Sequence, residues 1–213
     1  MGISRLVVRT VVGGLFIGHG TQKLFGWFGG PGMRGGEQLM DSIELAPPRP
    51  HAVAAGLTET AGGSMLVTGL ATPFAAAGLI GTMLTAIRRV HRPNGVWNTN
   101  GGYEFNLVLI AALLHLVEDG PGAPSLDRAL GFRRQGPLWA LGALGLGAGA
   151  STIVVEVARR HRARGDVQGG GSAQSAEPVS VHAAAPYSAE AAGLYPAEPA
   201  GLSEAVEQFG LAP

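Results

Sequence analysis

The sequence predicts an all-α integral membrane protein: a four-helix transmembrane bundle, a fifth transmembrane helix and a disordered C-terminal tail. Two observations predict this class. Hydrophobic residues make up 46% of the 213 residues and charged residues only 14%, although a polar C-terminal region dilutes the average. Five stretches are also apolar enough to be weighed as spans of a hydrocarbon core of roughly 30 Å, which takes about 20 helical residues.

The expected spans are residues 6–28, 52–71, 73–90, 103–117 and 138–158. The third and fourth are short and need polar ends that snorkel or a locally thinned bilayer. The first has Arg5 and Arg9 at its start, as a signal peptide would. However, no A-x-A-like cleavage site follows and the chain continues through Lys23 into an aromatic-rich end, which favours a retained span.

The connections and the glycines predict how these spans pack. The link from Ala71 to Pro73 is so short that the second and third helices must be antiparallel neighbours, with Pro73 opening the third. Small-xxx-small pairs occur at Gly14 and Gly18, and at Gly145 and Gly149. Because such pairs let helix backbones approach closely in lipid, we expect one tight bundle.

The chain divides into three regions. Residues 1–130 form the four-helix membrane bundle, and residues 131–164 form an additional transmembrane helix with a basic flank. Residues 165–213 form a tail rich in glycine, alanine and proline, whose charged residues are all acidic. This tail cannot bury enough apolar surface to fold alone and is expected to be disordered, with residues 203–209 as a short docking helix.

Charge and cysteine content exclude several function classes. Acidic and basic residues are equal in number, 15 each, which argues against nucleic-acid binding because that needs a basic excess. The chain has no cysteine, so it holds no disulfide, thiolate-bound metal or thiol nucleophile. Redox chemistry in this protein must therefore use a bound small molecule or a partner.

Polar residues converge at one end of the predicted bundle. We call the end that carries the N-terminus side A and the opposite end side B. If the helices alternate in direction, the first four each bring polar residues to side B, with His19 and Glu59 roughly 10 Å deep. These are His19, Gln22, Lys23, Glu59, Arg88, Arg89, Tyr103, Glu104 and Asn106. Ionised groups in hydrocarbon are costly unless paired, so we expect a polar pocket open toward side B.

Each of these residues also has a structural interpretation. Arg88, Arg89 and Tyr103 can be interfacial anchors, as is normal at the ends of spans. Lys23 and Glu59 can be an ion pair that holds two helices together. His19, Glu59 and His91 have no spacing typical of a metal site, and no metal is expected.

Three motifs carry a family resemblance: "GHGTQKLFGWFGG", the glutamate of "GLTETAGGSMLVTGLATP", and "NGGYEFNLVLIAALLHLVEDGPGAPSLD". Over residues 5–130 the sequence resembles the DoxX family of small membrane proteins. The resemblance implies a four-helix bundle related to the small subunit of thiosulfate:quinone oxidoreductase. It also implies association with a membrane oxidoreductase complex that includes superoxide dismutase and a thiosulfate sulfurtransferase, as for mycobacterial relatives. The residues carried over by position are His19, Gln22, Lys23, Glu59, Tyr103, Glu104 and Asn106.

The leading hypothesis is a plasma-membrane subunit for thiol or sulfur-oxyanion redox and oxidative-stress defence, which binds a quinone headgroup or a small anion. Lys23, Arg88 and Arg89 outnumber Glu59 and Glu104, which favours an anion or a developing quinol oxygen. Lys23 and Gln22 would donate hydrogen bonds to the ligand, and His19 or Glu59 would exchange a proton.

Two other functions stay open. The protein can be a scaffold whose tail recruits soluble detoxifying enzymes, or a small transporter, although side A offers few matching polar groups. The chain interacts with the lipid bilayer in each case and is compatible with a homo-oligomer. The distribution of Lys and Arg places side B and the tail in the cytoplasm.

Overall fold

The computed structural model describes residues 2–169, and this part of the chain is all-helical, as predicted. Its elements, in order, are α1 (Ile3–Phe25), η1 (Trp27–Gly29), α2 (Gly32–Ser42), α3 (Pro48–Thr68), α4 (Thr72–Ala86), η2 (Ile87–His91), η3 (Arg92–Asn94), η4 (Asn98–Asn100), α5 (Glu104–Asp119), α6 (Leu126–Ala129) and α7 (Pro137–Gly169). The short helix α2 was not predicted from the sequence.

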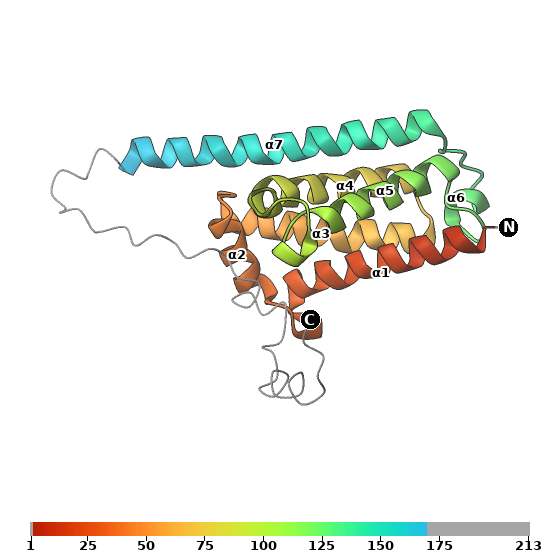
Figure 1. Cartoon of the computed structure of the whole chain (residues 1–213), viewed down its shortest axis with the longest axis horizontal. Coiled ribbons are helices and arrows are strands. Elements are labelled where there is room, and N and C mark those ends of the chain that lie inside the picture. The colour runs from red at the N-terminus through yellow and green to blue at the C-terminus, as the bar shows by residue number, and fades with distance from the viewer. Residues whose placement is uncertain (1, 170–213) are drawn as a thin grey trace, which may run out of the picture. The chain divides into compact units, whose positions relative to one another are not determined.

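Five helices run side by side along one direction: α1, α3, α4, α5 and α7 (Figure 1). Helix α1 packs mainly on α3, and α4 packs on α3, α5 and α7. Successive long helices reverse direction, so α1, α4 and α7 end at side B, whereas α3 and α5 begin there (Figure 1). Helix α2 lies at side B, and α6 lies at side A among the connections there.

Local chain chemistry explains where the helices turn. Helix α1 ends at Gly26, whose φ of 73° is the left-handed geometry that glycine adopts without a Cβ penalty. Helix α3 ends in the same way at Gly69, with φ 65°. Prolines occupy the first turns of α3 and α4, where a missing N–H costs nothing. The short link between α3 and α4 makes them antiparallel neighbours, as predicted.

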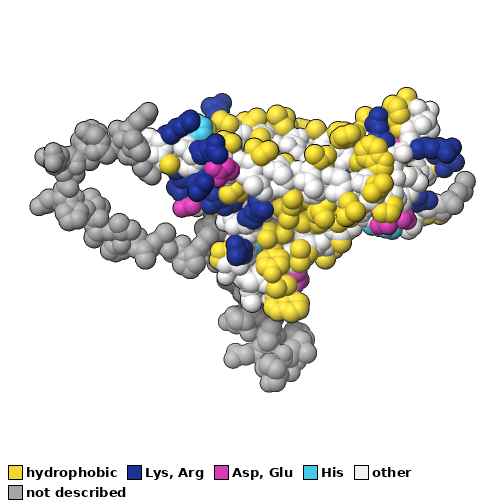
Figure 2. Space-filling view, turned by 90° about the horizontal axis from the view of Figure 1, so that it is seen from above, with side chains coloured by type: hydrophobic (Ala, Val, Ile, Leu, Met, Phe, Trp, Pro, Cys, Tyr) yellow, Lys and Arg dark blue, Asp and Glu magenta, His cyan; other side chains and the backbone are white. Residues whose placement is uncertain are grey.

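The core lies between the long helices. Its largest fully buried apolar side chains come from α1, α3, α4 and α5, and they are Phe16, Leu66, Leu79, Ile80, Leu113, Leu116 and Val117. Large apolar side chains also cover the outside, for example Ile3, which is 76% exposed, and Leu138, which is 84% exposed. Figure 2 shows apolar side chains over the middle of one face and Lys and Arg side chains toward its two ends. Such a surface suits a bilayer better than water.

Helix length and composition support only one of the expected spans directly. Among the described helices, only α7, over Pro137–Gly165, is both long enough and apolar enough to cross a membrane. Helices α4 and α5 have only 15 and 16 residues, and α1 carries three charged residues. Of the five expected spans, helix length and hydropathy therefore support only the fifth directly.

The glycines that pack the helices are not the predicted ones. Gly14, Gly18, Gly145 and Gly149 have open space where a Cβ would lie, so the expectation that they form the internal contacts is wrong. A Cβ on Gly13 would instead lie 2.7 Å from the backbone oxygen of Gly63. The small-xxx-small spacing identified glycine-rich helices correctly but selected the wrong faces.

Candidate functional site

An ion pair joins α1 to α3 near side B. Lys23, in the last turn of α1, places its Nζ 2.5 Å from Oε2 of Glu59. The Glu59 side chain is only 6% exposed and the Lys23 side chain 20%. A buried carboxylate must be paired to remain charged, so the two residues form one unit within the helix contact.

The close approach of α1 and α3 brings these two side chains together. A Cβ on Gly20 would lie 2.7 Å from the oxygen of Gly56 and 2.6 Å from the nitrogen of Thr60. Only glycine fits at that distance. We call the contact formed by Gly13, Gly20, Gly56, Thr60 and Gly63 the glycine seam. On α3, Glu59 lies between the two glycine contacts of this seam, at Gly56 and Gly63, and Thr60 Oγ1 is buried in the seam without a hydrogen-bond partner.

The other two polar residues of α1 differ in exposure. Gln22 is partly buried, whereas His19 is exposed. His19 follows Val11 and Leu15 at intervals of four residues, and both of these are exposed as well. His19 therefore lies on an exposed face of α1 but close to the side chains of Gln22, Lys23 and Glu59, while Lys23 reaches toward α3.

The two predicted arginines contact other elements. Arg88 Nη1 donates a hydrogen bond to Thr152 Oγ1 in α7, at 3.0 Å. Arg89 Nη1 lies 3.4 Å from Oε2 of Glu44, in the link between α2 and α3. Arg162 of α7 lies 2.8 Å from the other carboxylate oxygen of Glu44. These arginines thus connect α4 to α7 and do not pair with Glu59.

The predicted residues of α5 are held within the bundle end. Asn106 is buried and its Nδ2 donates to Met83 Sδ of α4, at 3.4 Å. The backbone N–H groups of Tyr103 and Glu104 donate to Gly95 and Val96, which fixes the start of α5. Both side chains are partly buried. Among the described residues, no hydrogen bond or ion pair links these three to Lys23 or Glu59.

Sequence reasoning missed a buried polar group at side A. Arg9 is 4% exposed and donates to the carbonyl oxygens of Pro121, at 2.9 Å, and Pro124. Asp127 is 2% exposed and accepts hydrogen bonds from the N–H groups of Ala71 and Thr72. Both side chains bind backbone groups of the connections at side A, so they stabilise these turns. One signal was available: α4 has no acidic residue of its own in its first turn.

The described residues contain no group of three or more His, Asp or Glu placed to hold a metal ion. On side B, the Lys23–Glu59 pair is the best candidate for binding a ligand. It combines a cationic donor and a carboxylate in a contact that excludes most water. Hydrogen-bond donors in such a site act more strongly than they do in water.

Residues 4–92 match the family model DoxX. The match includes Lys23, Glu59, Arg88 and Arg89, but it ends before Tyr103, Glu104 and Asn106, so it covers less than the resemblance over residues 5–130 implied. No curated protein and no solved structure matched the chain. DoxX is a family of membrane proteins, of the kind associated with oxidoreductases. The chain therefore carries a DoxX domain at residues 4–92.

Proposed function

We propose that the Lys23–Glu59 pair is the ligand site of a membrane redox subunit and that it binds a quinone headgroup. The subunit would pass electrons from a thiol or sulfur-oxyanion donor to the quinone, in defence against oxidative stress. One observation carries the proposal: a lysine and a glutamate 2.5 Å apart at a buried helix contact. Charged residues inside membrane proteins commonly mark functional sites.

The residues present fit a quinone carbonyl. Lys23 has three N–H donors, of which the contact with Glu59 occupies one. Its side chain is partly exposed, so the remaining donors can reach a ligand. Gln22, one residue earlier and partly buried, adds an amide donor.

The charges favour a neutral headgroup over a small anion. Glu59 balances Lys23, whereas Arg88 and Arg89 point their donors to Thr152 and Glu44. The positive excess expected from the sequence is therefore not gathered at the ion pair. A neutral carbonyl oxygen needs hydrogen-bond donors at a site with no net charge. The pair provides this, because Lys23 supplies the donors and Glu59 balances its charge.

Each residue has a defined part in this proposal. A bound quinone supplies the two-electron acceptor. Lys23 orients its carbonyl oxygen and stabilises negative charge there, while Glu59 holds Lys23 in place and carries a proton at its carboxylate. His19 lies on the outer surface of α1, where it can exchange protons near the site without touching the ion pair. The glycine seam excludes water from the inner side of the pair.

The test is solvent extraction of the full chain purified in detergent, with quinone counted per chain. We expect near-stoichiometric quinone in the wild type and none in Lys23→Met. That variant leaves Glu59 unpaired, which costs about 3–5 kcal/mol. The double variant Lys23→Met/Glu59→Gln removes both charges and separates loss of ligand from loss of fold.

Arg133→Met is the matched control, because Arg133 is an exposed cation at side A. It should keep its quinone. Quinone retained in the folded double variant would contradict the proposed site. Absence of quinone from the wild type would contradict the function itself and favour a scaffold that recruits soluble enzymes such as superoxide dismutase or a thiosulfate sulfurtransferase.

A further inference from the structure

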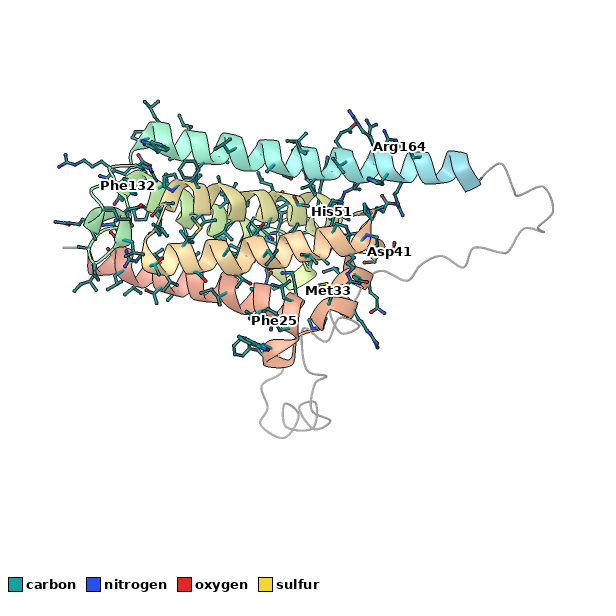
Figure 3. The ribbon with its side chains drawn as sticks, turned by 180° about the vertical axis from the view of Figure 1, so that it is seen from behind. Phe25, Met33, Asp41, His51, Phe132 and Arg164 are labelled. Atoms are coloured by element: carbon teal, nitrogen blue, oxygen red, sulfur yellow. The ribbon has the colours of Figure 1, made fainter. Side chains whose placement is uncertain are left out.

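Arginines from α7 and from the region that follows α4 gather at side B. We call them the arginine cluster, which consists of Arg88, Arg89, Arg92, Arg159, Arg160, Arg162 and Arg164. In Figure 2, Lys and Arg side chains crowd the end where α7 finishes, and Figure 3 labels Arg164 on that part of α7. The cluster is separate from the Lys23–Glu59 site and has no part in the proposed quinone binding.

Ion pairs and a hydrogen bond hold the cluster in place. Glu44 lies between the arginines that follow α4 and those of α7, with its carboxylate 3.4 Å from Arg89 and 2.8 Å from Arg162. Arg88 adds a hydrogen bond to Thr152 of α7. These contacts tie the end of α4 to α7 and fix the spacing of the cations before any ligand binds. A preorganised cluster loses less conformational entropy on binding.

The cluster keeps most of its positive charge. Seven arginines face two paired carboxylates, Glu44 and Glu156, which leaves an excess of five positive charges. Arg92 and Arg164 are both exposed. Among the described residues, neither has a carboxylate within ion-pair distance. The cluster is therefore suited to an anionic partner.

The apolar surface beside the cluster identifies that partner. On α7, Leu146, Ile153 and Val157 are 60%, 65% and 42% exposed, and Arg159 and Arg160 follow directly. An apolar helix face that leads into arginines has the same polarity profile as a phospholipid, with acyl chains beside the apolar side chains and phosphate beside the guanidinium groups. Arginine also binds phosphate through two parallel hydrogen bonds. We propose that the arginine cluster binds the headgroups of anionic phospholipids.

An acidic protein is the rival partner for a basic surface. The position of the cluster favours lipid, because the α7 arginines follow the apolar stretch that ends at Ala158 and so lie at headgroup depth if that stretch spans the bilayer. A soluble acidic protein would need cations that project well beyond that depth. The proposal depends on membrane placement alone and stands or falls independently of the quinone.

The test is a titration of the full chain, purified in detergent, with short-chain phosphatidylglycerol and, separately, phosphatidylcholine. Thermal stabilisation gives the apparent affinity for each. We expect tighter binding of phosphatidylglycerol that weakens as salt increases. Arg92→Gln/Arg164→Gln removes two exposed arginines without touching the Glu44 contacts. It should weaken phosphatidylglycerol binding on the order of 25-fold, since each arginine near an anionic surface contributes about fivefold.

The matched control is Arg128→Gln/Arg133→Gln, which removes two exposed arginines from side A. It should bind phosphatidylglycerol like the wild type. Equal loss in both double variants would show a general charge effect and overturn the site. Unchanged affinity in Arg92→Gln/Arg164→Gln would also overturn it. A wild type that does not distinguish the two lipids would overturn the choice of lipid and leave an acidic protein as the partner.

Discussion

At the scale of single residues, the molecule contains two kinds of buried charge. Asp127 is satisfied: its two carboxylate oxygens accept the N–H groups of Ala71 and Thr72 and the hydroxyl of Thr72, at 2.8 to 3.1 Å. It also lies at the N-terminus of α4, where the helix dipole favours a negative charge. In the Lys23–Glu59 pair, Lys23 has N–H donors left over, because its contact with Glu59 occupies only one of three. Asp127 therefore acts as a structural residue, whereas the ion pair is the site that we propose binds the ligand.

This assignment predicts the effect of Asp127→Asn. The amide retains one acceptor and introduces an N–H donor that faces other donors, so hydrogen bonds to a buried charged group are lost at about 1.5–3 kcal/mol each. We expect a clearly lower melting temperature for the detergent-solubilised protein, with quinone content per folded chain unchanged. Thr72→Val removes only the hydroxyl contact and should cost less, about 0.5–1.5 kcal/mol. A melting temperature equal to that of the wild type would contradict the capping role.

At the scale of elements, the glycine seam sets the geometry of the site. Gly13 and Gly63 meet toward side A, and Gly20 meets Gly56 toward side B. The separation of α1 and α3 is therefore determined by backbone contact along the whole crossing. The Lys23–Glu59 ion pair depends on this separation, because a wider crossing would move Lys23 away from Glu59.

Gly20→Ala should separate the two helices, because the new methyl group would meet the backbone of α3 at 2.6 to 2.7 Å. We expect a loss of about 1–3 kcal/mol in stability, typical of overpacking, together with reduced quinone content. Gly18→Ala is the control two residues away, since its Cβ would enter open space. That variant should match or slightly exceed the wild type in thermal unfolding. Equal stability of the two variants would contradict the seam.

Sequence reasoning predicted helix order and depth better than helix rotation. Counting residues from the helix ends placed His19 at the depth of Glu59, because rise per residue is fixed, and Lys23 lies on the same predicted helix face as His19. It could not choose Gly20 over Gly18, because the helices are apolar nearly all round and their periodicity does not show which side faces inward. Nor could it send Arg88 to Thr152, since that contact depends on where α7 packs.

At the scale of the whole molecule, the charges indicate an orientation in the membrane. Ten of the 15 Lys and Arg residues lie toward side B when the arginines of α7 are included. Of the five toward side A, Arg9 is buried and bound by carbonyl oxygens, so it acts as a packing residue. Cytoplasmic ends of membrane proteins carry the excess of Lys and Arg. We therefore predict that side B faces the cytoplasm.

This orientation predicts opposite locations for the two termini. If α1, α3, α4, α5 and α7 all cross the bilayer, a reporter active only in the cytoplasm should be active when fused after Pro213 and silent when fused before Met1. Activity at both termini would mean an even number of crossings, for which the shorter helices α4 and α5 are the first to examine. A reporter silent only at the C-terminus would invert the orientation. The arginine cluster would then face the outer leaflet, and the lipid titration alone would decide whether it still binds anionic headgroups.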